Sequence, residues 1–192
     1  MTTTWPIRYL QPHFYATMDY SLEPSITRLA GLMTNESRIQ ATVEAALELA
    51  EWETQLPGKL VPVIQGYSLS EYLHCLELYR EAGLIRPYMA VGSMCRRRNS
   101  AVLGELIPGI HRAAQEYGCE RLHFFGLKLS PDLVPYEDMI WSRDSAVCLD
   151  CYDETIRAAQ GGRRFPRGQK EKQVVFESFL LRLKSLELNY LR

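Results

Sequence analysis

The sequence lacks the features that mark membrane and secreted proteins. No apolar run approaches the roughly 18 residues that span a bilayer, and no basic segment followed by an apolar core is visible at Met1. The five cysteines are odd in number and show no framework spacing. These absences predict a reduced cytoplasmic protein without a membrane segment, rather than a disulfide scaffold.

Strong charge and common nucleotide motifs are also missing. The formal net charge is only −1, so any affinity for nucleic acid must come from local basic patches. The chain has no G-x-G-x-x-G segment, no P-loop, no repeats and no low-complexity stretch. We therefore predict no nucleotide cofactor and expect the catalytic chemistry to come from side chains.

What the sequence does contain is an alternation of strand and helix patterns. Strands are predicted at residues 15–18, 60–64, 88–91, 122–127 and 139–141. Helices are predicted at residues 35–52, 70–82, 100–117, 145–159 and 174–191, after an irregular lead-in of a dozen residues. The run 60–64 is apolar throughout, which is typical of a strand buried on both faces of a parallel sheet.

This alternation predicts an α/β fold built from βα units. A complete eight-unit barrel takes roughly 250 residues, and the chain has 192. We predict a single (β/α) domain over residues 1–192, resembling a TIM barrel that lacks its first strands. An open α/β sheet, or one piece of a split enzyme, is the alternative.

Polar and small residues follow the predicted strands and form the candidate site. These residues are Asp19, Gln65, Gly66, Gly92, Ser93 and Asp144. Side chains at the carboxyl ends of parallel strands face an open crevice, so they are expected to meet at one ligand. Two carboxylates, an amide and two glycines that admit a flat ring suit a purine-like base.

Four segments follow one another in a familiar order. They are Gln65-Gly66, Gly92-Ser93-Met94-Cys95-Arg96-Arg97, Leu122-His123-Phe124-Phe125-Gly126-Leu127-Lys128 and Ser142-Arg143-Asp144-Ser145. Their order and spacing resemble the tRNA-guanine transglycosylase superfamily, most closely its deazapurine DNA-modification branch. The Met18-Asp19 loop with Glu23-Pro24 also looks like that branch. The resemblance covers roughly residues 14 to 150.

The resemblance implies a (β/α)₈ barrel that exchanges guanine in a nucleic acid for a 7-deazaguanine, DNA being favoured over tRNA. It implies that Asp144 is the nucleophile that attacks the sugar C1′. Asp19 would read the N–H edge of the base, Gln65 its carbonyl, and Gly92 would supply a backbone contact. A covalent intermediate on a carboxylate fits retention of configuration at C1′.

Two departures from the family pattern concern completeness. The family's Asp-Ser-Gly-Gly-like strand end has no counterpart in this sequence, and neither has the Cys-x-Cys-x₂-Cys…His zinc site of the tRNA enzymes. Cys148 and Cys151 stand at i and i+3 of a predicted helix and look like core residues, so no metal is predicted. We expect a second subunit or a homodimer to complete the barrel. Alternatively, the chain is a non-catalytic or half-site binding subunit, or an unrelated small-molecule α/β enzyme.

Basic residues in two places are candidates for contact with the nucleic-acid backbone. They are Arg96, Arg97 and Arg98 after the third predicted strand, and Arg163, Arg164, Arg167 and Lys170 in the loop 161–172. In both places a solvated charged loop is the alternative. The final predicted helix, residues 174–191, is expected to pack on the barrel or to face a partner.

Each site residue also has a purely structural explanation. Asp144 could cap the helix predicted from Ser145, Asp19 could form a turn, and Gln65 could satisfy loop backbone. His123 alternates with apolar neighbours in a strand and is expected to be a core histidine with a satisfied ring.

Overall fold

The computed structural model describes residues 4–28, 33–95, 97, 99–127 and 131–144. The chain divides into two units, residues 1–127 with 136–143 and residues 128–135 with 144–192. Most described residues belong to the first unit, and the second is described only at 131–135 and 144. The helices predicted at 145–159 and 174–191 and the basic loop 161–172 lie outside the described residues, so the single domain stays a prediction.

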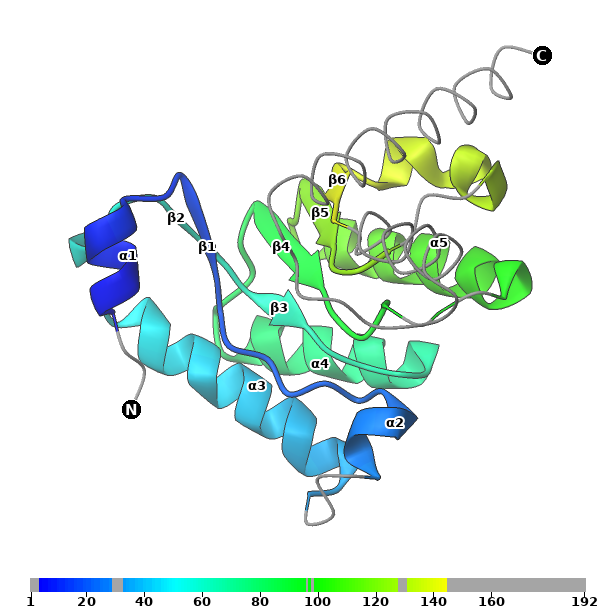
Figure 1. The fold of residues 1–192 in the computed structure, drawn as a ribbon, viewed down its shortest axis with the longest axis horizontal. Coiled ribbons are helices and arrows are strands. Elements are labelled where there is room, and N and C mark those ends of the chain that lie inside the picture. Colours follow the sequence, from blue (N-terminus) through cyan, green and yellow to red (C-terminus); the bar gives the residue numbers. More distant parts are fainter. Residues whose placement is uncertain (1–3, 29–32, 96, 98, 128–130, 145–192) are drawn as a thin grey trace, which may run out of the picture. The chain divides into compact units, whose positions relative to one another are not determined.

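Helices and strands alternate along the first unit (Figure 1). The described elements are α1 (Trp5–Leu10), β1 (Phe14–Ala16), α2 (Pro24–Thr27), α3 (Asn35–Ala50), η1 (Glu53–Gln55), β2 (Lys59–Val61), β3 (Val63–Ile64), α4 (Leu69–Glu81), β4 (Tyr88–Val91), α5 (Ser100–Glu116), β5 (Arg121–Phe124), η2 (Pro131–Met139) and β6 (Ser142–Arg143). The predicted α/β alternation is therefore confirmed.

All strand pairs are parallel. β1 pairs with β2, and β3, β4, β5 and β6 follow one another in a four-stranded sheet. Pro62, which has no N–H, separates β2 from β3, while its carbonyl accepts the N–H of Ala90 at 2.9 Å. The predicted strand 60–64 is thus divided between β2, which pairs with β1, and β3, which pairs with β4. Among the described residues the strands do not close into a barrel.

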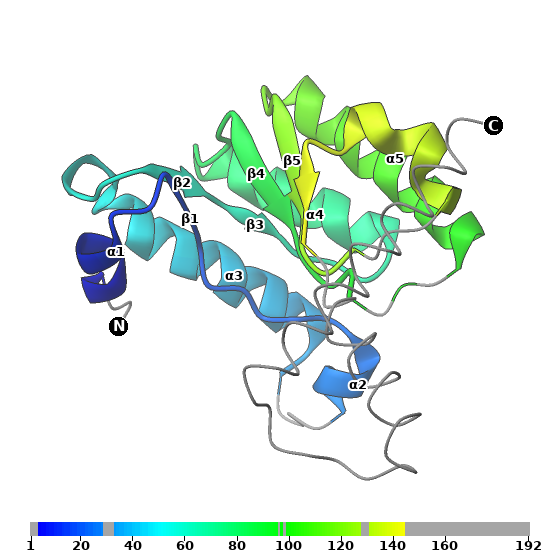
Figure 2. The same ribbon diagram turned by 45° about the horizontal axis from the view of Figure 1, so that its top comes forward.

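Helices α3, α4 and α5 lie side by side along one face of the strands (Figure 2). Their buried side chains recur at helical spacing, including Ile39, Val43, Ala46 and Leu49 of α3, Tyr72, Cys75, Leu76 and Tyr79 of α4, and Leu103, Leu106, Ile107 and Ile110 of α5. The two buried phenols are paired: Tyr72 donates to the carbonyl of Gly92 at 2.8 Å and Tyr79 to that of Val63 at 2.9 Å. Because buried polar groups are costly when unpaired, these bonds fix α4 against β3 and the end of β4.

Capping residues lie at the ends of α3, α4 and α5, which fall close to the predicted ranges. The Thr34 hydroxyl accepts the N–H of Ser37 at 3.1 Å at the start of α3. Ser68 and Glu71 form a capping box at the start of α4. Gly83 and Gly118 follow α4 and α5 with positive φ angles of 66° and 99°.

Two local predictions are wrong. The lead-in contains the helix α1, whose Pro6 stands in the first turn, where a missing N–H costs nothing. Residues 139–141 are not the last strand: η2 runs to Met139, and the N–H of Ile140 still bonds to the Glu137 carbonyl at 3.1 Å. The strand is β6. Met139 and Ile140 belong to the helical turn before it, whereas the N–H of Trp141 already bonds to the Leu122 carbonyl of β5 at 3.1 Å.

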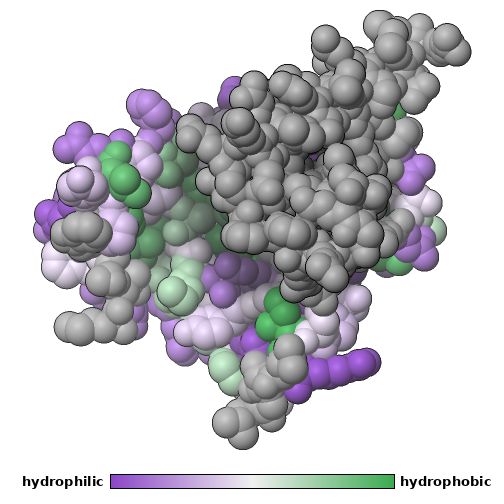
Figure 3. All heavy atoms as spheres, viewed as in Figure 1, coloured by the Kyte–Doolittle hydropathy of each residue, from purple (hydrophilic) through white to green (hydrophobic). Residues whose placement is uncertain are grey.

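Apolar side chains are also exposed near the first strand. Figure 3 shows hydrophobic residues gathered over β1 and β2 beside α1, among hydrophilic ones. Phe14 and Met18 belong to the exposed large side chains. A groove of about 470 Å³ between β1 and α3 is lined partly by Ala16, Ala41 and Ala45. Within the described part of the chain, no helix is both long and apolar enough to cross a bilayer.

Candidate functional site

The carboxyl ends of the parallel strands carry most of the predicted site. Gln65 directly follows β3, and Gly92 directly follows β4. Asp19 lies three residues beyond β1. Asp144 directly follows β6 and is the first residue of the second unit's longer segment. The structure therefore brings Asp19, Gln65 and the start of the β4 loop together in one unit.

Four of these residues form a hydrogen-bonded group, which we call the edge cluster: Asp19, Gln65, Gly92 and Ser93. The Gln65 side chain donates from Nε2 to Oδ2 of Asp19. Its Oε1 accepts the hydroxyl of Ser93 at 2.7 Å. Gln65 is 0% exposed. Both ends of its amide are engaged by protein, so Gln65 holds Asp19.

Gly92 is in close contact with this amide. A Cβ on Gly92 would overlap Nε2 of Gln65. The Gly92 N–H donates to the carbonyl of Ile64 at 3.0 Å, and the Gly92 carbonyl accepts the Tyr72 hydroxyl at 2.8 Å. Burial raises the pKa of Tyr72 well above its ordinary value, so the phenol keeps its proton and donates. Glycine is required here for packing against Gln65.

Ser93 joins the cluster to the loop that carries Asp19. Its backbone has a positive φ of 55°, which is uncommon for a residue other than glycine. Its hydroxyl oxygen accepts the N–H of Leu22 at 2.9 Å and lies 3.3 Å from the Ser21 hydroxyl. Non-glycine residues in this region are strained by about 1–3 kcal/mol and persist where the surroundings determine them. The conformation of Ser93 therefore links the end of β4 to the 19–23 loop.

The electrostatics of Asp19 follow from its position at the rim of this cluster. Asp19 is exposed as a residue. Desolvation of its carboxyl group nevertheless raises its pKa above the ordinary value. The hydrogen bonds from Gln65 and from its own backbone N–H oppose the rise. Asp19 is thus the acidic group of the cluster that a ligand can reach.

Gly66 and Cys75 support the cluster from the helix side. A Cβ on Gly66 would overlap the backbone N and ring of Tyr72, so glycine allows α4 to approach. The Cys75 sulfur accepts the N–H of Gln65 at 3.3 Å. Burial raises the pKa of the Cys75 thiol to about 12, so it remains protonated and is no nucleophile.

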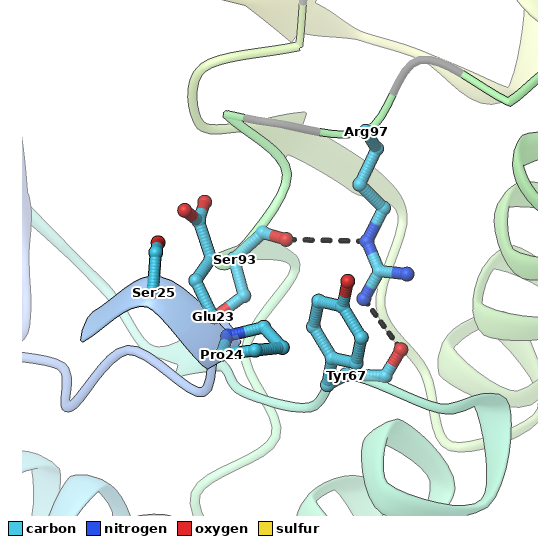
Figure 4. A pocket seen from close by; sticks show the side chains of 6 residues that line it. All are labelled: Glu23, Pro24, Ser25, Tyr67, Ser93 and Arg97. Atoms are coloured by element: carbon cyan, nitrogen blue, oxygen red, sulfur yellow. Dashed lines mark hydrogen bonds between the residues drawn. The ribbon is translucent and has the colours of Figure 1, made fainter. Parts of the chain in front are cut away.

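A pocket of about 190 Å³ adjoins the cluster, and we call it the side pocket (Figure 4). It is lined by Glu23, Pro24, Ser25, Tyr67, Ser93 and Arg97. Arg97 donates from Nε to the Ser93 carbonyl at 3.2 Å and from Nη2 to the Tyr67 carbonyl. Its guanidinium carbon lies 4.2 Å from the centre of the Tyr67 ring. The sequence alone did not single out Ser25 or Tyr67. Only the Glu23-Pro24 pair indicated that the loop after Asp19 was of interest.

The remaining predicted site residues have different outcomes. Arg97 lies at the side pocket rather than on an isolated loop. Arg96, Arg98, Arg163, Arg164, Arg167 and Lys170 lie outside the described residues, as do Cys148 and Cys151. His123 is half-buried, with its Nδ1 2.9 Å from the Ser142 hydroxyl and its ring against Phe125, consistent with a core histidine. Among the described residues no group of three potential metal ligands occurs.

Parallel strands that end in a carboxylate, an amide and a close-packed glycine define a class of α/β proteins that bind ligands at the carboxyl edge of the sheet. The family model described as DpdA, DeoxyPurine in DNA protein A, matches residues 9–155, which is more than half of the chain. The chain therefore belongs to the DpdA family. No curated protein matches it. The resemblance to the deazapurine DNA-modification branch is confirmed at the level of the family.

Proposed function

We propose that this chain is a base-exchange transglycosylase that replaces a guanine in DNA by a 7-deazaguanine. Membership of the DpdA family, over a match that includes Asp19, Gln65, Ser93 and Asp144, carries the proposal. The edge cluster supports it, because a carboxylate held by a buried amide at the end of parallel strands is suited to a polar heterocycle.

In the proposed reaction Asp144 is the nucleophile. One carboxylate oxygen bonds to C1′ while the bond from C1′ to the guanine nitrogen breaks, and guanine leaves with the electron pair and takes up a proton. The incoming 7-deazaguanine loses its ring N–H proton, bonds to C1′ and displaces Asp144. Two displacements retain the configuration. Asp19 accepts hydrogen bonds from the N–H edge of the base.

The edge cluster gives Gln65 a role different from the one that the resemblance implies. Because both ends of its amide are bound, we propose that Gln65 is a positioning residue that fixes Asp19. Ser93 fixes Gln65 in turn. The Asp19 carboxylate then needs little reorganisation when a base arrives.

We also propose that the fold is a partial (β/α) barrel completed by another chain. Among the described strands β1 pairs only with β2. An unpaired strand edge beside a groove of mixed polar and apolar lining offers hydrogen bonds and buried surface to a further strand. A second copy or a different subunit would occupy this edge.

Replacement of the proposed nucleophile tests the function directly. Asp144→Asn should abolish incorporation of a labelled 7-deazaguanine into duplex DNA, because an amide is a far weaker nucleophile. Asp138→Asn, which removes an exposed acid from η2, is the matched control and should exchange normally. Circular dichroism would confirm equal folding. Wild-type exchange by Asp144→Asn would contradict the assignment.

A half-site binding subunit is the second candidate, because β1 pairs only with β2 among the strands that the structure describes. In that case the purified chain alone binds DNA but exchanges no base, and activity appears on addition of a partner. Activity of a purified monomer, established by sedimentation, would contradict this candidate.

Competition between duplex DNA and tRNA for the same labelled base would separate the two nucleic-acid substrates.

A further inference from the structure

The loop that carries Asp19 is held from two sides. The chain from β1 to α2 runs along α3 in Figures 1 and 2. On the strand side, the Ser93 hydroxyl oxygen accepts the N–H of Leu22 at 2.9 Å. On the helix side, two residues of α3 bond to the same loop, and we call them the α3 anchor: Arg38 and Thr42. The edge cluster includes the first contact, whereas the α3 anchor lies outside it.

Thr42 bonds to the loop through a buried hydroxyl. Its oxygen accepts the N–H of Tyr20 at 3.0 Å, and its proton is donated to the carbonyl of Arg38 at 2.8 Å. Thr42 is 0% exposed. A hydroxyl has one proton and two lone pairs, so the bond to the carbonyl four residues earlier orients the oxygen and leaves it able to accept. The group that it accepts belongs to the residue next to Asp19.

Arg38 bonds to the following residue of the loop through a buried guanidinium. Its Nη1 donates to the carbonyl of Ser21 at 3.3 Å, and the residue is 4% exposed. Its Nε is buried and has no hydrogen-bond partner within the described structure. None of the ion pairs between described residues includes Arg38. A buried cation without a carboxylate partner lowers stability, because its desolvation is not compensated.

This charge indicates that Arg38 does more than fill space. Apolar side chains of similar size often leave stability unchanged or raise it when they replace buried charged groups. Packing alone would therefore favour a residue such as methionine at this position of α3. A guanidinium differs from methionine in that it donates a charge-assisted hydrogen bond, which is stronger than a neutral one. The acceptor of that bond is the Ser21 carbonyl in the loop.

The loop after Asp19 is bonded at three consecutive residues. The N–H of Tyr20 and the carbonyl of Ser21 bond to α3, and the N–H of Leu22 bonds to Ser93. The Leu22 side chain is 1% exposed. Ordering a residue costs conformational entropy, and these bonds order the loop during folding rather than when a base binds. The backbone that carries Asp19 is therefore set before a base arrives.

We propose that Arg38 and Thr42 are positioning residues that fix the Asp19 carboxylate for recognition of the base. The inference rests on the proposed function, in which Asp19 accepts hydrogen bonds from the N–H edge of the base. Gln65 holds the carboxylate itself, whereas the α3 anchor holds the backbone on which it stands. Both anchor residues are buried and act through the loop, so α3 is a third element that builds the site.

The first test compares two substitutions of Thr42. Thr42→Val keeps a similar shape without the hydroxyl, and Thr42→Ser keeps the hydroxyl. The pKa of Asp19 is raised mainly by desolvation of its carboxyl group, and a carboxyl ¹³C NMR titration measures it without substrate. Thr42→Val should lower the Asp19 pKa toward its ordinary value, because a released loop admits water. Thr42→Ser should keep the raised pKa. An unchanged Asp19 pKa in Thr42→Val would overturn the proposal.

Arg38→Met tests the other half of the anchor, with Arg112→Met, at an exposed arginine of α5, as the matched control. Arg38→Met should leave the urea midpoint unchanged or raise it, and it should lower the Asp19 pKa. The KM for a labelled 7-deazaguanine should rise roughly 10-fold, as for one lost charge-assisted hydrogen bond, while affinity for duplex DNA stays unchanged. Arg112→Met should change none of these quantities. A lower urea midpoint with an unchanged Asp19 pKa and KM would show a purely structural role and contradict the proposal.

The two readouts separate this inference from the proposed function. If the wild type exchanges bases but neither substitution moves the Asp19 pKa or the KM, the α3 anchor is refuted and the function stands. If exchange is never observed, the proposed function fails, and the Asp19 pKa still decides about the anchor. A fall of that pKa in Thr42→Val that is absent from Thr42→Ser then supports the anchor, and no fall refutes it.

Discussion

The edge cluster and the side pocket differ in how far their polar groups are satisfied within the protein. In the edge cluster every group that touches Gln65 is bonded, and Gly92 leaves no room for a methyl group. In the side pocket the buried Ser25 hydroxyl has no partner within the described structure, while the Arg97 guanidinium bonds to the carbonyls of Ser93 and Tyr67. A region whose polar groups are hydrogen-bonded within the protein contributes stability and alignment. A region with an unpaired polar group contributes binding of a ligand. Substitutions in the first should lower stability, and substitutions in the second should lower affinity.

The largest effect is expected for Gly92→Ala. The added Cβ overlaps the buried Gln65 amide, and overpacking of this kind costs typically about 1–3 kcal/mol. Loss of the Asp19 contact should abolish base exchange as well. Urea unfolding measures the free-energy change. Gly83→Ala, where nothing lies within 4 Å of the new Cβ, is the control and carries only the strain of its positive φ. Equal costs at the two glycines would contradict a close-packed cluster.

Ser93→Ala should have the next largest effect. It removes the hydroxyl that donates to Gln65 and accepts from Leu22, which leaves buried groups unpaired at a cost of about 1–3 kcal/mol. The exchange rate should fall more than the affinity for DNA, because Asp19 loses its alignment. Ser37→Ala, an exposed serine of α3, serves as the comparison. A fall in DNA affinity without a fall in rate would show that Ser93 binds rather than positions.

A pH effect is expected at Asp19. Its pKa is raised in the folded chain, so the folded state holds more protons than the unfolded state between the ordinary pKa and the raised one. The contribution of Asp19 to stability therefore falls as pH rises through that interval. Asp19→Asn should remove this slope from urea midpoints measured across the acidic range. An unchanged slope would show that the carboxyl group is not desolvated.

The smallest effect on stability is expected for Ser25→Ala. The hydroxyl is buried and has no partner among the residues that the structure describes, so its removal should leave stability unchanged or raise it by up to about 1 kcal/mol. Thermal unfolding measures the change in stability. A clear loss of stability would mean that Ser25 is bonded in solution and that the side pocket is saturated too.

The sequence was sufficient to predict the alternation of helices and strands and the polar residues that follow the strands. The apolar run 60–64 and the helical patterns at 35–52 and 70–82 predicted elements that the structure contains. These signals are local, because apolar runs and helical spacing are set within a few residues. The last strand was misplaced, since Met139 and Ile140 resemble a strand but belong to a helical turn, and the chain joins β5 only from Trp141 onward.

The interior of the candidate site was harder to predict. Both ends of the Gln65 side-chain amide are bonded by residues that are distant in the sequence. Ser93 is 28 positions away and Asp19 is 46 positions away. The stack of Arg97 on Tyr67 likewise joins residues 30 positions apart. No period or motif in the sequence reports such pairings. The sequence therefore predicted which residues gather at the strand ends but not which of them face a ligand.

Detection of the covalent intermediate tests the account most directly. The full chain would be mixed with guanine-containing duplex DNA, denatured, and its adducts mapped by mass spectrometry. The account predicts a DNA-linked peptide that contains Asp144 in the wild type and its loss in Asp144→Asn. Base exchange without any adduct at Asp144, or an adduct at another residue, would contradict it.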